Sequence, residues 1–116
     1  MNTIDVRKNY LYVYYDEAYD VNRFINMLEE IADTCKKKDI KKVLANLKNM
    51  LGEPTFTDRF KLGVASAKIL KGGFKFAIVY KNTASNRFSE TVAVNRGLPA
   101  RITDNEEEAK RWLGVE

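Results

Sequence analysis

The chain has 116 residues, the length of one domain, and we expect a single domain over residues 1–116. Its composition, 45% hydrophobic and 31% charged, excludes a disordered or membrane-embedded chain, and no apolar run approaches the ~18–20 residues of a membrane span. One cysteine and no histidine exclude an internal disulfide, histidine-based zinc sites and catalysis by an imidazole base. Because the first residues contain no apolar signal core, we expect a cytoplasmic protein.

The net charge of +4 is unevenly distributed along the chain. Residues 59–103 hold nine basic side chains and a single acidic one, Glu90, whereas the flanking segments are slightly acidic. A segment this basic can steer anions such as phosphorylated small molecules or lipid headgroups, or it can supply the solvated faces of a helix pair. Nucleic acid is the least favoured partner, because the basic residues are spread out and no nucleic-acid motif accompanies them.

Two short strands are predicted near the N-terminus, over residues 3–7 and 10–15, split by a polar pair. In the second strand Tyr10, Tyr12 and Tyr14 fall on one face, because side chains alternate along a strand. This tyrosine face could form a dimer surface or contact an apolar ligand, or it could belong to the core.

A long helix follows, with Asp20 as its expected N-cap. Apolar residues recur at steps of three and four as far as Cys35, which is typical of a helix lying on a sheet. Three lysines, 36–38, end the helix, where positive charge suits the helix dipole. A buried strand is predicted over residues 42–49.

A second helix is predicted from Thr57, the expected N-cap, to about Leu70. Its expected inner side consists of Phe56, Phe60, Val64, Ala67 and Leu70. Gly63 inside this helix indicates close backbone packing, because glycine in a helix costs about 1 kcal/mol relative to alanine.

The C-terminal third continues the alternation of strands and helices. We expect an interior strand over 74–80, a helix over 84–96, a strand over 100–103 and a last helix capped by Asp104 with Glu107. Repeated strand–helix–strand units predict an α/β fold with a mainly parallel sheet and one antiparallel edge strand.

Several segments together resemble the SpoIIAA-like, STAS-type domain family: residues 57–63, 74–79, 87–97, 100–104 and 108–113. The resemblance implies a SpoIIAA-like β/α superhelix. In that fold a mixed, mostly parallel sheet of about five strands carries four helices, mainly on one face. It also implies a regulatory domain that acts by binding another protein.

In the best-understood members, the anti-sigma factor antagonists, a partner kinase phosphorylates a serine at the start of the helix after the third strand. The matching stretch here, residues 54–59, has no serine and offers Thr55 and Thr57 instead. Thr57 is the candidate phosphorylation site, because a phosphate suits the free amide groups at a helix start; the alternative is a simple N-cap.

The fold also resembles the core of the CRAL-TRIO lipid-binding proteins, which implies a pocket for an amphipathic ligand. The tyrosine face, Met27 and Met50 could line such a pocket, or they could be ordinary core residues.

Enzymatic chemistry finds little support in the sequence. Asp20 and Asp58 are explained as residues at helix starts, and Cys35 lies on an apolar stripe. There is no glycine-rich phosphate loop, serine elbow or calcium-binding spacing. We therefore expect no catalytic residues, no metal and no cofactor.

In open parallel sheets ligands bind beyond the carboxyl ends of the strands, near helix N-termini. The loops at 50–58 and 81–86 meet this description, and each is followed by an arginine. The candidate ligand- or partner-binding residues are Thr55, Thr57, Asp58, Arg59, Lys61, Asn86 and Arg87. They could form an anion site, or the arginines could pair with Glu90 or Asp58 and only brace the fold.

We thus expect a non-enzymatic regulatory domain that binds a partner protein, or a second copy of itself, in a cytoplasmic circuit. The alternative is a small carrier or sensor of an amphipathic anionic ligand such as a lipid, with peripheral contact to a membrane surface.

Overall fold

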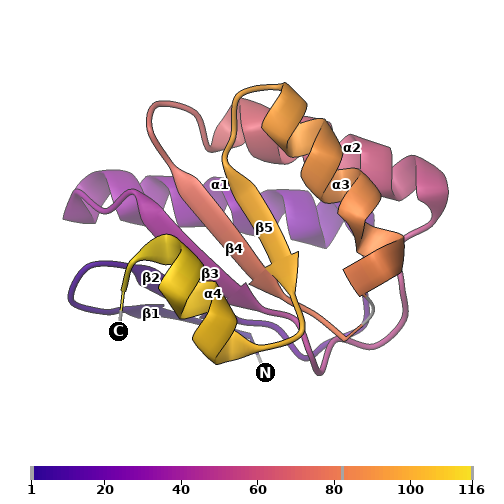
Figure 1. Cartoon of the computed structure of the whole chain (residues 1–116), viewed down its shortest axis with the longest axis horizontal. Helices are drawn as coiled ribbons and strands as arrows, with labels where there is room; N and C mark the ends of the chain where they lie inside the picture. The colour runs from indigo at the N-terminus through magenta and orange to yellow at the C-terminus, as the bar shows by residue number, and fades with distance from the viewer. Residues whose placement is uncertain (1, 82, 116) are drawn as a thin grey trace.

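The computed structural model describes the backbone of residues 2–81 and 83–115, together with their side chains except those of residues 83–85 (Figure 1). The strands are β1 (Thr3–Val6), β2 (Leu11–Tyr14), β3 (Lys42–Asn46), β4 (Lys75–Val79) and β5 (Ala100–Thr103). The helices are α1 (Val21–Lys38), α2 (Phe56–Ile69), α3 (Thr83–Asn95) and α4 (Glu106–Leu113). Every predicted element is present in the predicted order, and the strand expected over 42–49 ends earlier, at Asn46.

The five strands form one sheet in the order β1-β2-β3-β4-β5. β1 pairs antiparallel with β2, and the pairs from β2 to β5 are parallel. The predicted mainly parallel sheet with an antiparallel edge strand is therefore confirmed. Because β2 to β5 run in one direction, all four carboxyl ends lie at one edge of the sheet and all four amino ends at the other.

Alternating side chains divide the interior into two cores on opposite faces of the sheet. The larger core lies between the sheet and α1, α2 and α3, with Val13, Val43 and Phe76 pointing into it. Leu44 and Val79 point to the other face, where α4 alone among the described helices covers them (Figure 1). The expectation that helices lie mainly on one face is confirmed.

The caps of α1 and α2 follow local side-chain chemistry. Asp20 caps α1 as predicted, accepting a hydrogen bond at 3.0 Å from the Arg23 amide. The prediction that Thr57 caps α2 is wrong, because Thr55 performs this role and its Oγ1 accepts from the Asp58 amide at 3.1 Å. Thr57 instead lies within the first turn of the helix, two residues after the cap.

The inner side predicted for α2 is also partly wrong. Phe56 and Phe60 are 69% and 43% exposed, while Gly63 and Ser66 are buried. A Cβ added at Gly63 would lie 2.8 Å from the Val92 Cβ, so α2 and α3 approach closely, as the glycine predicted. The small side chains permit this approach of α2 to α3, and the two phenylalanines lie at its solvent-exposed rim.

At α4 the predicted cap is displaced by one residue. Asn105, rather than Asp104, is the N-cap, and its Oδ1 accepts from the Glu108 amide at 3.0 Å. Either residue type can cap a helix, and the register of the turn after β5 decides between them.

Candidate functional site

The loops at the carboxyl edge of the sheet are joined to one another before α2 begins. Ala18 and Leu51 form an isolated parallel bridge, and the Tyr19 amide donates to the Leu51 carbonyl at 2.8 Å. The hydroxyl of Tyr80 donates to the Gly52 carbonyl at 3.1 Å. These bonds hold the segment that leads into α2 in a fixed place.

Asp58, in the first turn of α2, accepts a hydrogen bond from the Tyr19 hydroxyl at 3.0 Å. Burial, and then the nearby Asp58 carboxylate, raise the pKa of Tyr19 far above that of an ordinary tyrosine. Tyr19 therefore remains a neutral donor, and the Asp58 carboxylate is engaged in linking α2 to the loop before α1.

Arg59 joins α2 to α3. Its Nε donates to Oδ1 of the buried Asn86 at 3.1 Å, and its carbonyl accepts from the Ser89 hydroxyl at 3.1 Å. Arg87 lies 3.6 Å from Glu90, whose carboxylate also accepts from the Ile102 amide at 2.7 Å. The structure thus brings Arg59 and Asn86 together, while Arg87 makes the bracing pair with Glu90.

The remaining candidates are exposed. Thr57 lies on the surface of the first turn of α2, and its phosphorylation stays a prediction. Lys61 is exposed and makes no ion pair within the part of the chain that the structure describes. The predicted loop 81–86 includes residue 82 and the side chains of 83–85, which lie outside the described set, so the anion site there also stays a prediction.

Three phenylalanines, Phe56, Phe60 and Phe88, form a cluster on the outer side of α2 and α3, which we call the aromatic patch. The rings of Phe56 and Phe88 stack with centroids 4.6 Å apart and planes inclined by 20°, and Phe60 lies 6.5 Å from Phe88. The guanidinium of Arg96 lies 5.7 Å from the Phe60 ring. Large contiguous apolar patches are uncommon on the surface of a monomeric protein and mark interaction sites, so this patch is a candidate for one.

Sequence reasoning missed this patch because it assigned Phe56 and Phe60 to the core. A signal was nevertheless present. Gly63 and Ala67 lie on the same helical stripe as the two phenylalanines, and small residues at one point of a stripe mark where a neighbouring helix approaches closely. The phenylalanines lie nearer the start of α2, at the rim of that approach.

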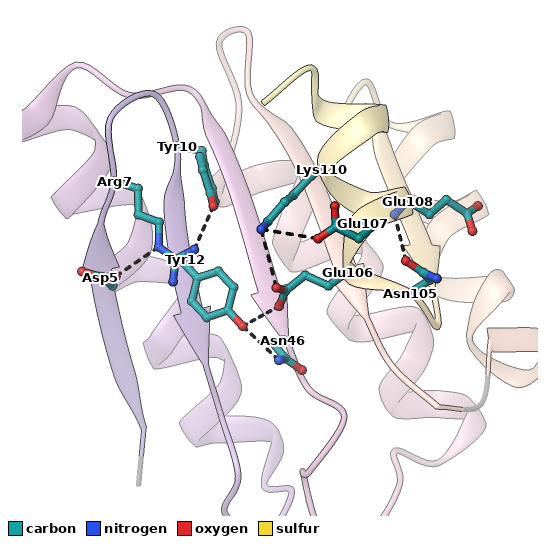
Figure 2. Close-up of polar contacts among 10 residues, drawn as sticks. All are labelled: Asp5, Arg7, Tyr10, Tyr12, Asn46, Asn105, Glu106, Glu107, Glu108 and Lys110. Atoms are coloured by element: carbon teal, nitrogen blue, oxygen red, sulfur yellow. Dashed lines mark hydrogen bonds and ion pairs between the residues drawn. The ribbon is translucent and has the colours of Figure 1, made fainter. Parts of the chain in front are cut away.

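The tyrosine face borders the chain's own α4, and Tyr12 reaches the first turn of that helix at Glu106 (Figure 2). Tyr10 is only 2% exposed and belongs to the smaller core. The Tyr12 hydroxyl donates to the Glu106 carboxylate at 2.6 Å and accepts from the Asn46 amide at 3.0 Å. Tyr14 remains half-exposed, with its hydroxyl accepting from Asn49 at 2.9 Å.

Arg7, in the turn between β1 and β2, contacts two tyrosines of the same face. Its guanidinium lies 4.0 Å from the centre of the Tyr12 ring and donates to the Tyr10 hydroxyl at 2.9 Å (Figure 2). Tyr10 is thus a core residue, one of the alternatives that the sequence left open, whereas a dimer or ligand contact at the half-exposed Tyr12 and Tyr14 stays a prediction.

No protein-family model matches the sequence, and no curated protein matches it. Solved structures do. An anti-sigma factor antagonist from Mycobacterium paratuberculosis superposes with a TM-score of 0.63 at 13% identity, covering 98% of this chain and 93% of that one. An uncharacterized DUF3478-family protein from Shewanella loihica, described as having a SpoIIAA-like fold, gives a TM-score of 0.55 at 17% identity over 97% and 92% of the two chains. This chain has the SpoIIAA-like fold.

Within this SpoIIAA-like fold, the cavity between the sheet and the α2–α3 pair measures about 60 Å³. Phe24, Leu62 and Phe76 are among its apolar lining residues, and Asn86 and Ser89 are among the polar ones. Pockets for small organic ligands are typically about 300–1,000 Å³, so this cavity does not support the lipid-carrier alternative.

Two further features concern the described residues of this SpoIIAA-like chain. They contain no cluster of three acidic, cysteine or histidine side chains that could hold a metal ion. No helix in the described segments is both long and apolar enough to cross a membrane.

Proposed function

We propose that this chain is a non-enzymatic regulatory domain that binds a partner protein through the aromatic patch. The observation that carries the proposal is the exposure of Phe56 and Phe60, at 69% and 43%, beside the stacked Phe88. Folding alone gives no reason to leave large apolar rings in water, whereas aromatic clusters commonly dominate the binding energy of protein interfaces.

Local geometry supports this use of the patch. The hydrogen bond from Arg59 to Asn86 fixes α2 against α3, so the rings are presented on a rigid surface. Preorganised side chains lose little conformational entropy on binding. Arg96 and the exposed Lys61 add positive charge nearby, which favours a partner with acidic residues around an apolar centre.

The comparison with solved structures supports the functional class. The Mycobacterium protein that shares the fold is an anti-sigma factor antagonist, a regulator by its name. We extend only the general role to this chain: regulation by protein binding, in a cytoplasmic circuit.

The test is affinity purification of the full chain from its own host, with co-purifying proteins identified by mass spectrometry and their affinities then measured. The wild-type chain should retain a specific partner, and Phe56→Ser/Phe60→Ser should weaken its binding at least about tenfold. Val6→Ser is the matched control, because Val6 is also an exposed apolar residue, at 44%, but lies on the edge strand β1.

Thermal unfolding of each variant verifies that the fold is kept. Recovery of the same partner at unchanged affinity with the double variant would contradict the proposal. A wild-type dimer that the double variant converts to a monomer in sedimentation analysis would identify the partner as a second copy of the chain.

A further inference from the structure

The amino edge of the sheet, opposite the start of α2, carries a group of cations. The turns that precede β2 and β3 meet there and border an open hollow of about 460 Å³. Its positively charged lining, which we call the basic hollow, consists of Arg7, Lys8, Lys38, Lys41 and Lys42. Asp39 is the acidic residue in the lining.

Local structure explains only part of this charge. Lys38 lies in the last turn of α1, where it offsets the negative end of the helix dipole, and Arg7 pairs with Asp5 at 3.1 Å. The four lysines of the basic hollow make no ion pair within the described segments. Like charges held together repel one another, so a cluster of this kind lowers stability unless an anion neutralises it.

The cations continue beyond the hollow along the same edge. A Cβ at Gly72 would lie 3.9 Å from Nζ of Lys41, so the turn before β4 adjoins the basic hollow and adds the exposed Lys71. Three turns at the amino edge of the sheet therefore carry positive charge. Such an arrangement is broad and matches an anionic surface better than a narrow ligand.

We propose that the basic hollow docks this chain onto the surface of an anionic phospholipid bilayer. Four of its five cations are lysines, whose compact charges on flexible stems can follow mobile headgroups without a fixed hydrogen-bond geometry. Each lysine near an anionic membrane strengthens partitioning about fivefold, so several together give substantial binding at low salt.

Other polyanions fit this edge less well. Single-stranded nucleic acid is usually held by exposed aromatic rings, but Phe74 beside the hollow is buried and has Lys41 Nζ 4.9 Å from its ring centre. A protein partner is usually anchored by a desolvated apolar centre, whereas this lining is mostly cationic.

The test is co-sedimentation of the full chain with vesicles of phosphatidylcholine alone or of phosphatidylcholine and phosphatidylserine in equal parts. Binding should require phosphatidylserine and should be lost between about 0.1 M and about 1 M salt, where the Debye length falls from about 10 to about 3 Å. Lys8→Gln/Lys38→Gln, which changes two exposed lysines of the hollow, should weaken binding about 25-fold.

Lys48→Gln/Lys81→Gln is the matched control, because it removes the same charge from exposed positions at the carboxyl edge. This control should bind within about twofold of the wild type, since these lysines lie far from the docked surface. Absence of binding to the anionic vesicles, or equal weakening by both variants, would overturn the proposal.

Binding to soluble RNA or polyglutamate at least about tenfold tighter than to the anionic vesicles, at equal charge concentration, would also overturn it by identifying a different occupant. This proposal does not rest on the proposed function, because it uses the other edge of the sheet. Vesicle binding and partner binding can therefore fail separately.

Discussion

Two threonines separated by one residue have different roles at the start of α2. The Thr55 hydroxyl accepts a hydrogen bond from the Asp58 amide, whereas Thr57 is an exposed residue of the first turn. Thr55→Ala should lower the free energy of unfolding by about 1 kcal/mol, the usual value of an N-cap, and Thr57→Ala by less than about 0.5 kcal/mol. Urea denaturation measures both, and the reverse order would show that the cap is assigned to the wrong residue.

Tyr12 is one of the residues that attach α4 to the sheet by hydrogen bonds; another is Lys75, whose Nζ donates to the Trp112 carbonyl at 2.9 Å. Removing its hydroxyl in Tyr12→Phe leaves the Glu106 carboxylate and the Asn46 amide without this partner. Because the bond to Glu106 involves a charged, half-buried carboxylate, Tyr12→Phe should lower the free energy of unfolding by about 1–2 kcal/mol.

Tyr14→Phe is the matched control for this substitution, since its hydroxyl bonds Asn49 at an exposed position. It should change the free energy of unfolding by less than about 0.5 kcal/mol. Equal effects of the two substitutions, measured by urea unfolding, would contradict a special role for Tyr12 in holding α4.

At the scale of elements, the contact between α2 and α3 depends on the absence of a side chain at Gly63. A methyl group there would lie 2.8 Å from the Val92 side chain and 2.9 Å from the Ser89 carbonyl oxygen. Helix propensity favours alanine by about 1 kcal/mol, but overpacking costs about 1–3 kcal/mol, so Gly63→Ala should be net destabilising.

Ala65→Gly in the same helix provides the comparison, because it changes helix propensity in the opposite direction at a half-buried position. We expect it to lower the free energy of unfolding by about 1 kcal/mol. If Gly63→Ala raised the melting temperature, the close approach of the two helices would be disproved.

The element order could be predicted from sequence because apolar periodicity differs between strands and helices. β4 is an apolar run bounded by turn residues, and α1 has one clear stripe from Phe24 to Cys35. In α2 the stripe that holds Phe56, Phe60 and Ala67 is only partly buried, and the buried Leu62 and Ser66 lie beside it. Only the packing of α3 against Gly63 decides which side faces inward.

The candidate site was predictable to a similar degree. The position of Arg59 and Arg87 near helix starts follows from local patterns, as does the pairing of Arg87 with Glu90 three residues later, but the partner of Arg59 does not. Arg59 meets Asn86, which lies 27 residues away, because α2 and α3 are neighbours in space. The aromatic patch arises in the same way, from a contact between Phe56 and Phe88 that no local pattern encodes.

At the scale of the whole molecule, the sheet separates two surfaces of different chemistry. The aromatic patch lies on α2 and α3, towards the edge where β3 and β4 end, and the basic hollow lies where β2 and β3 begin. The parallel direction of β2 to β5 creates this separation. The starts of α2 and α3 lie at the carboxyl edge of the sheet, and the lysine-rich turns before the strands lie at the amino edge. The domain could therefore bind a protein and an anionic surface at the same time.

The stability of the whole molecule should depend on alkaline pH through Cys35, which is fully buried on α1. Burial raises the pKa of this thiol from 9.0 to about 11. Between these values an unfolded chain releases the proton while the folded chain retains it, so the unfolded state is increasingly favoured as pH rises. The thiol therefore costs no stability below about pH 9, and by pH 11 the free energy of unfolding should be lower by about 2–3 kcal/mol.

Urea unfolding of the wild type and of Cys35→Ala at several pH values measures this contribution. The variant should start less stable because it loses core packing, but its stability should fall less steeply between pH 9 and pH 11. Buried tyrosines such as Tyr15 and Tyr80, whose pKa values burial also raises, titrate in both proteins and cancel in the comparison. Parallel pH profiles would mean that the thiol ionises as easily in the folded chain as in the unfolded one.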